Sequence, residues 1–331
     1  MEAQEDLIPT ASVEPPSVLR WRTILAVPIA ALFALALHTL IAKNEAPLET
    51  HSYRLLFVEV IGVAIILAFL RRLSPALRRW MANMWPIFTA AILLLCIWDV
   101  ITLGFRMLPL PYFPGPAAVL RSMINDRVLL LDSTWHSLVL LLSGYTLGVI
   151  AGLISGICIG WSAPVRYWGM PVLKVVGPIP ATAWIPLAIV LSPSAIVSSA
   201  ALIALAVWFP VTMLTSSGIS NTRASYLDVA RTLGAGREYL ILRVAIPAAI
   251  PNIFIGLFMG LGASFLTLVV AESVGVKSGL GWYVSWAQGW AEYGKVFAAL
   301  IIMAAFFSTI MTLLFKVRDH VLVWQKGVIK W

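Results

Sequence analysis

Charged residues are scarce in this chain of 331 residues, of which Asp, Glu, Lys and Arg make up only 11%. Soluble globular domains carry about 25% charged residues, so this sequence lacks the charge that a water-exposed surface needs. Two cysteines, Cys96 and Cys158, leave no disulfide framework to interpret. A Walker-type phosphate loop, a His-Glu-x-x-His motif and a Cys-x-x-Cys pair are also missing. We therefore expect a chain that is not an enzyme and binds no metal or cofactor of its own.

Apolar residues make up 60% of the chain and gather into eight long runs. A helix needs about 20 mostly apolar residues to cross a hydrocarbon layer about 30 Å thick. The pattern predicts an all-α polytopic membrane protein, surrounded by lipid, with helices at Ile24–Ala42, Leu55–Leu70, Trp85–Phe105, His136–Trp161, Pro171–Ser192, Ile196–Gly218, Pro251–Val274 and Phe297–Phe315.

The basic residues predict the orientation of these helices. Most of the 23 Lys and Arg residues fall in every second loop, starting with the N-terminal segment. Short basic loops stay on the cytoplasmic side of a membrane, so both termini are expected in the cytoplasm. The net charge of +8 then belongs to these loops, and we expect no nucleic-acid partner.

A basic stretch with an internal proline, residues 71–83, separates the first two apolar runs from the six that follow. We expect a disordered cytoplasmic tail at 1–19, which is acidic and contains prolines. Residues 20–80 are interpreted as an accessory two-span region. Residues 81–331 are interpreted as the working core.

One predicted helix carries a stripe of glycines spaced four residues apart, from Gly144 to Gly160. Residues four apart share a helix face, and small residues let a second helix approach closely. The stripe indicates either packing within one subunit or a position on a permeation path or subunit seam.

The next predicted helix contains Pro178 and Pro180 in its interior. Interior prolines break a helix, and backbone freed at membrane depth must be buried in protein or line a watery cavity. The segment is thus either part of a solute path, with Trp184 as a gate, or a kinked packing helix.

The longest predicted cytoplasmic loop, residues 219–250, has the pattern of two short helices joined by glycines. Ser225 and Asp228 fit a capping box at the start of the first helix. Gly234 supplies a left-handed C-terminal cap, and Gly236 a second break. Apolar residues share one face of the first helix, namely Leu227, Ala230 and Leu233.

The second short helix is expected to begin at Arg237 and to end before Pro247. Two amphipathic helices outside the membrane must bury their apolar faces, either on a lipid surface or in a partner's groove. The tight glycine elbow favours a compact docking knob.

This loop resembles the EAA loop of the permeases of binding-protein-dependent ABC importers. That family's pattern is Glu-Ala-Ala, three residues, Gly, nine residues, then Ile-x-Leu-Pro; the matching residues here are Asp228-Val229-Ala230, Gly234 and Val244-Ala245-Ile246-Pro247. The resemblance implies a MetI-like core of six spans, here preceded by two extra transmembrane helices. It also implies that the loop is the coupling helix of separate ATPase subunits, which bind ATP and Mg.

Further segments are similar to the nitrate, sulfonate, taurine and bicarbonate branch of these permeases. They are YFPGPAAVL at 112–120, GPIPATAWIPLAIVL at 177–191, IPAAIPNIFIGLFMGLGASFLTLVVAE at 246–272 and SGLGWYV at 278–284. Many members follow the broken helix with Trp-Phe-Gly-x-Gly, whereas this chain has Leu191-Ser192-Pro193-Ser194.

Polar residues inside the predicted spans are candidates for contact with a solute. Asn252, Ser264 and Thr267 could donate hydrogen bonds to an oxyanion, although Ser and Thr often bond their own helix. Glu272 would repel an anion and is interpreted as structural, as a cap or a partner of Lys277. In the accessory helices, His38 and Glu59 could pair.

The sequence thus predicts a multi-pass inner-membrane permease for a small oxyanion or sulfonate, acting by alternating access. Its expected partners are ABC ATPase subunits, an extracytoplasmic solute-binding protein and a second copy of itself. Two alternatives remain: an importer for a neutral or aromatic solute, and a secondary transporter that works without ATP.

Overall fold

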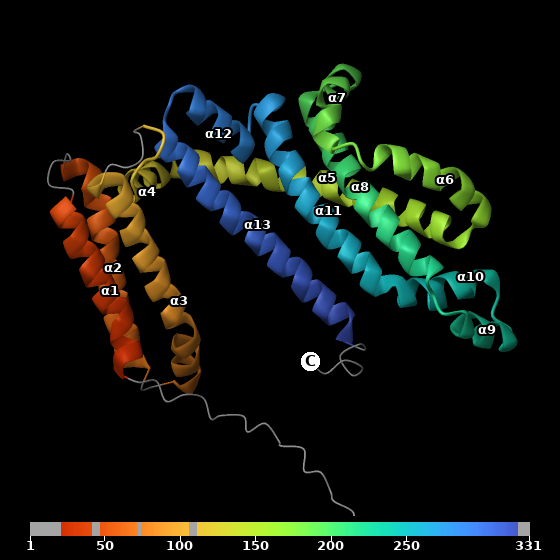
Figure 1. Cartoon of the computed structure of the whole chain (residues 1–331), viewed down its shortest axis with the longest axis horizontal. Helices are drawn as coiled ribbons and strands as arrows, with labels where there is room; N and C mark the ends of the chain where they lie inside the picture. The colour runs from red at the N-terminus through yellow and green to blue at the C-terminus, as the bar shows by residue number, and fades with distance from the viewer. Residues whose placement is uncertain (1–20, 42–46, 72–73, 106–110, 324–331) are drawn as a thin grey trace, which may run out of the picture. The chain divides into compact units, whose positions relative to one another are not determined.

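The computed structural model describes residues 21–41, 47–71, 74–105 and 111–323, and nearly all of them are helical (Figure 1). The predicted tail at 1–19 lies outside these ranges. The chain divides into two compact units, Met1–Arg121 and Ser122–Trp331, which we describe separately.

Three helices form the first unit: α1 (Trp21–Ile41), α2 (Pro47–Leu70) and α3 (Pro75–Asp99). A π-helical turn (Val100–Gly104) continues α3, and α4 (Pro116–Asn125) begins at the last proline of the Pro-rich loop. The helices share one apolar core, so α3 packs with the accessory helices α1 and α2. The structural division therefore falls after Arg121, while the functional division at residue 80 stays a prediction.

A histidine and an aspartate pair inside this core. His38 Nδ1 on α1 lies 2.7 Å from Asp99 Oδ2 on α3, and the two residues are 1% and 2% exposed. The ring of Tyr53 meets the His38 ring edge-on at 4.7 Å. Glu59 is exposed, so the expected pairing of His38 with Glu59 is wrong.

The second unit contains four long helices, α5 (Arg127–Trp161), α8 (Ala195–Ser220), α11 (Ile246–Val274) and α13 (Tyr293–Val321). Between α5 and α8 the chain forms α6 (Ala163–Val176), a 3-10 turn (Ala181–Trp184) and α7 (Ile185–Leu191). The helical segments on either side of the break are bent by 84° relative to each other, as in a broken span or a re-entrant loop. The interior prolines therefore predicted the break correctly.

By length and apolar composition, six of the described helices can cross a membrane, and the bent pair would make a seventh. The part of α1 at Leu25–Ile41 is apolar but shorter. Seven of the predicted apolar runs thus correspond to helices and the eighth, Pro171–Ser192, to the bent pair, which confirms a polytopic all-α membrane protein.

The glycine stripe of α5 faces α8 within the same chain. A Cβ added at Gly148 would lie 2.5 Å from the Ala204 carbonyl oxygen, and one added at Gly152 would lie 2.8 Å from Val211 Cβ. These separations are far below van der Waals contact, so only glycine permits so close a helix pair. Packing within one subunit is therefore confirmed as the role of the stripe.

Glu272, near the end of α11, fixes the start of α12 (Leu280–Gly289). Ser137 Oγ donates a hydrogen bond to Glu272 Oε1 at 2.7 Å, and the Gly281 N–H donates to Oε2 at 2.8 Å. The carboxylate thus satisfies a free amide at a helix N-terminus, where negative charge is favourable. Its polar partners are Ser137 and Gly281 rather than Lys277.

Candidate functional site

The loop between α8 and α11 holds α9 (Ala224–Thr232) and a short helix α10 (Arg237–Tyr239) that leads into a π-helical turn (Leu240–Ala245). The turn runs directly into α11, and residues Arg237–Val274 are one continuous 38-residue helical stretch. The prediction that the second short helix ends before Pro247 is therefore wrong.

The π-helical turn explains how the helix passes this proline. The Ile246 N–H bonds to the Ile241 carbonyl, five residues back, so the hydrogen-bond register shifts just before Pro247. Pro247 then occupies an opening position of α11, where a missing N–H and a fixed φ are tolerated.

The elbow between α9 and α10 depends on Gly234. Its φ is +86°, a left-handed conformation that L-residues with a side chain rarely adopt. The Ala235 N–H bonds to the Ala230 carbonyl at 3.0 Å, and the Gly234 N–H bonds to the Arg231 carbonyl at 2.9 Å. These two bonds are a Schellman motif, which confirms the predicted cap. Gly236 has an ordinary φ of −72°.

The predicted capping box at the start of α9 does not form. The helix begins at Ala224, and its N-cap residue, Arg223, makes no side-chain capping bond. Ser225 therefore lies inside the first turn, and Asp228 Oδ1 instead accepts a hydrogen bond from Arg231 at 3.0 Å. Both partners are exposed, so this ion pair contributes little stability.

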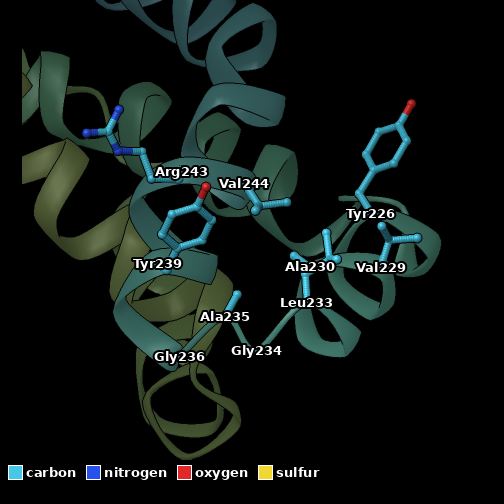
Figure 2. Close-up of a pocket in the computed structure, with 10 residues that line it drawn as sticks. All are labelled: Tyr226, Val229, Ala230, Leu233, Gly234, Ala235, Gly236, Tyr239, Arg243 and Val244. Carbon is cyan, nitrogen blue, oxygen red and sulfur yellow. The ribbon is translucent and has the colours of Figure 1, made fainter.

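An open groove of about 660 Å³ lies in the angle between α9 and the α10 segment (Figure 2). Leu233 is 83% exposed, and Val229 is 59% exposed. Arg243 supplies the basic group of the lining. The groove is lined by Tyr226, Val229, Ala230, Leu233, Gly234, Ala235, Gly236, Tyr239, Arg243 and Val244.

Four of the residues predicted for this loop line the groove, namely Ala230, Leu233, Gly234 and Gly236. Leu227 is half-buried and Ser225 is exposed, and neither lines the groove, whereas Tyr226 and Val229 do. The missed signal was the spacing of Tyr226, Val229 and Leu233, which places them along one side of a helix. Exposed apolar side chains gathered in one concave surface typically mark a protein interaction site.

The residues proposed for a solute path lie on two elements. Pro178 and Pro180 form the bend between α6 and α7, and Trp184 ends the 3-10 turn that follows. The indole Nε1 of Trp184 is buried, and no acceptor is found for it among the described residues. This turn packs against both α8 and α11.

The hydroxyl groups on α11 have local partners. Ser264 Oγ donates to the Leu261 carbonyl at 2.6 Å, and Thr267 Oγ1 donates to the Ala263 carbonyl at 2.9 Å. Both residues are buried, so the donors an oxyanion needs are occupied. Asn252 is half-buried and packs on Gly218, where an added Cβ would lie 2.9 Å from Asn252 Cβ.

Residues 144–321 match the family described as the inner membrane component of binding-protein-dependent transport systems. The match covers more than half of the chain and includes the bent segment α6–α7 and the groove. The chain therefore belongs to this family of ABC transporter permeases. Membership implies a multi-pass inner-membrane protein with ATPase and solute-binding partners, and these permeases are not enzymes by themselves.

Curated relatives place the chain more closely. A Haemophilus influenzae protein named as an ABC transporter permease is 31% identical over 66% of this chain and 89% of its own length. Bacillus subtilis SsuC, whose name assigns it to aliphatic sulfonates transport, is 34% identical over 64% of this chain and 77% of its own. Escherichia coli TauC, a taurine transport system permease, is 31% identical over 65% of this chain and 80% of its own length. The chain thus falls in the sulfonate and taurine branch.

Proposed function

We propose that this chain imports a small sulfonate, with taurine as the reference solute, by alternating access driven by ATP. The observation that carries this proposal is the apolar groove of α9 and α10, which offers an ATPase subunit an exposed, shaped surface. ATP and Mg would bind to that partner. A solute-binding protein would deliver the solute on the other side.

The backbone around the groove is suited to transmit force. The Schellman motif at Gly234 fixes α9 against the segment that follows. That segment is continuous with α11, so a displacement of the groove is passed along a single helix into the membrane region. Hydrogen-bonded helices deform less easily than loops, and rigid elements of this kind can carry coupling between distant sites.

The 3-10 turn at Ala181–Trp184 supports a sulfonate as the solute. The buried indole N–H of Trp184 lacks an acceptor among the described residues, and a buried unpaired donor costs about 1–3 kcal/mol. A sulfonate oxygen could accept this bond. We further propose that two copies of the chain enclose the path.

The test compares valine substitutions at two glycines. Val is strongly disfavoured at positive φ, so Gly234→Val should distort the elbow, whereas Gly289→Val, on α12 and outside the groove, meets an ordinary φ and open space. We expect the tagged wild type and Gly289→Val to co-purify with the co-expressed ATPase. Gly234→Val should lose the ATPase while remaining folded in the membrane.

Equal capture of the ATPase by both variants would argue against the elbow as the docking element. Failure of the wild type to capture any ATPase would contradict the importer proposal and favour transport without ATP.

A further inference from the structure

Arg166, in the first turn of α6, bonds to the C-terminal ends of two other helices, α5 and α8. Its Nε donates to the Ile159 carbonyl at 3.1 Å, and its Nη2 donates to the Gly160 carbonyl at the end of α5. The same Nη2 donates to Ser220 Oγ, on the last residue of α8, at 2.7 Å. Ser220 Oγ in turn donates to the Gly160 carbonyl at 3.2 Å. We call these four residues the arginine clamp.

The clamp satisfies groups that would otherwise lack partners. The last carbonyls of a helix have no donor within it and carry partial negative charge, so a cation there is favourable. The Arg166 side chain is half-buried, and no carboxylate forms an ion pair with it among the described residues. Its charge is thus directed at helix ends rather than at an acidic residue.

The position of the clamp joins the two parts of the site. Ser220 ends α8 and is followed by a tight turn, in which the Thr222 N–H bonds to the Ile219 carbonyl at 3.2 Å, and then by α9. Arg166 itself lies on α6, which leads into the bend at Pro178 and the turn that ends at Trp184. A displacement of α9 must therefore act on a residue that Arg166 binds.

We propose that Arg166 is a positioning residue that passes movement of the α9 groove to the bent segment α6–α7. This inference rests on the proposed docking of an ATPase in the groove. A planar guanidinium with several fixed donors can hold acceptors from two helices at once, whereas a lysine ammonium is a point charge without that fork. Arg166→Lys should consequently keep the charge and lose the linkage.

The experiment follows amide hydrogen exchange in the detergent-purified complex of full-length chain and ATPase, with and without ATP and vanadate. We expect nucleotide to change exchange in the wild type both at residues 224–236 and at 177–184. In Arg166→Lys and in Ser220→Ala, the response at 224–236 should persist. The response at 177–184 should fall about fivefold or more, the lower end of typical coupling effects.

Lys174→Gln serves as the control, because it removes an exposed cation from the same helix and leaves the clamp intact. Ser220→Ala removes the hydrogen bonds from α8 to Arg166 and to Gly160 and leaves Arg166 on the Ile159 and Gly160 carbonyls, so it keeps the test valid if an Arg166 variant fails to fold. A full response at 177–184 in both clamp variants would overturn the inference. Absence of the ATPase from the wild-type preparation would instead overturn the proposed function on which it rests.

Discussion

At the scale of single residues, the His38–Asp99 pair presents an energetic problem inside an apolar core. The His38 Nε2 and the Asp99 Oδ1 have no hydrogen-bond partner among the described residues. Removing one member of a buried ion pair costs about 3–5 kcal/mol, whereas replacing both with apolar residues is often neutral or stabilising. We therefore expect the pair to fix which helices meet more than it adds stability.

Cys96 offers a local probe of this pair, because it is buried in the same core. In a Cys158→Ser background, we expect His38→Leu to raise the rate of thiol labelling at Cys96 about a hundredfold, since local opening becomes about 3 kcal/mol easier. The double variant His38→Leu/Asp99→Leu should label at nearly the wild-type rate. A double variant as reactive as the single one would contradict this account.

Trp184 permits a separate test of the solute path. Trp184→Phe removes the indole N–H and keeps an aromatic ring, so we expect the maximal rate of taurine uptake to fall about tenfold, as for loss of a hydrogen bond to a charged group. Trp168→Phe, at a site that is 76% exposed, is the control. Uptake of radiolabelled taurine by cells with the complete transporter measures both. An unchanged rate would favour a solute that stacks on the ring.

At the scale of helices, the contact between α5 and α8 tolerates no side chain on the glycine stripe. Gly148→Ala should lower the stability of the second unit by about 1–3 kcal/mol, because the added methyl group meets backbone that cannot move aside. Gly262→Ala, on α11, points into open space and should gain about 0.5–1 kcal/mol of helix stability. Thermal unfolding of the purified variants in detergent separates the two effects, and similar melting temperatures would contradict the packing argument.

At the scale of the whole molecule, the family match lies entirely within the second unit. A chain that lacks residues 1–73 keeps the groove and should still capture the ATPase. It also leaves Asp99 without His38, and a carboxylate at a lipid-facing site costs about 2.5–3.5 kcal/mol. We expect the membrane to contain less of the truncated chain than of the full-length chain. Asp99→Asn in the truncated chain should restore part of this loss.

Immunoblotting of membranes and co-purification with the ATPase check this expectation. Full-length Asp99→Asn is the control for the substitution itself. A truncated chain that reaches normal membrane levels but no longer captures the ATPase would show that the accessory helices take part in coupling.

Much of the candidate site could be predicted from the sequence, because its key features are local. Gly234 was identified from a glycine that follows an amphipathic stretch, and the left-handed φ needed there depends only on neighbouring residues. That Tyr226 and Val229 rather than Leu227 line the groove could not be predicted, because the residue at which a helix begins decides which side chains share its exposed face. Without a side-chain cap, nothing in the sequence marked Ala224 as that residue.

The sequence alone determined the apolar helices, the break at Pro178 and the glycine elbow, because run length, a missing N–H and a positive φ are properties of short segments. Only the tertiary structure decided that His38 meets Asp99, that Glu272 caps α12 and that Arg166 joins the start of α6 to the ends of α5 and α8. Each of these depends on the axial register between helices distant in sequence. That register is set by close packing of whole surfaces, which no local pattern encodes.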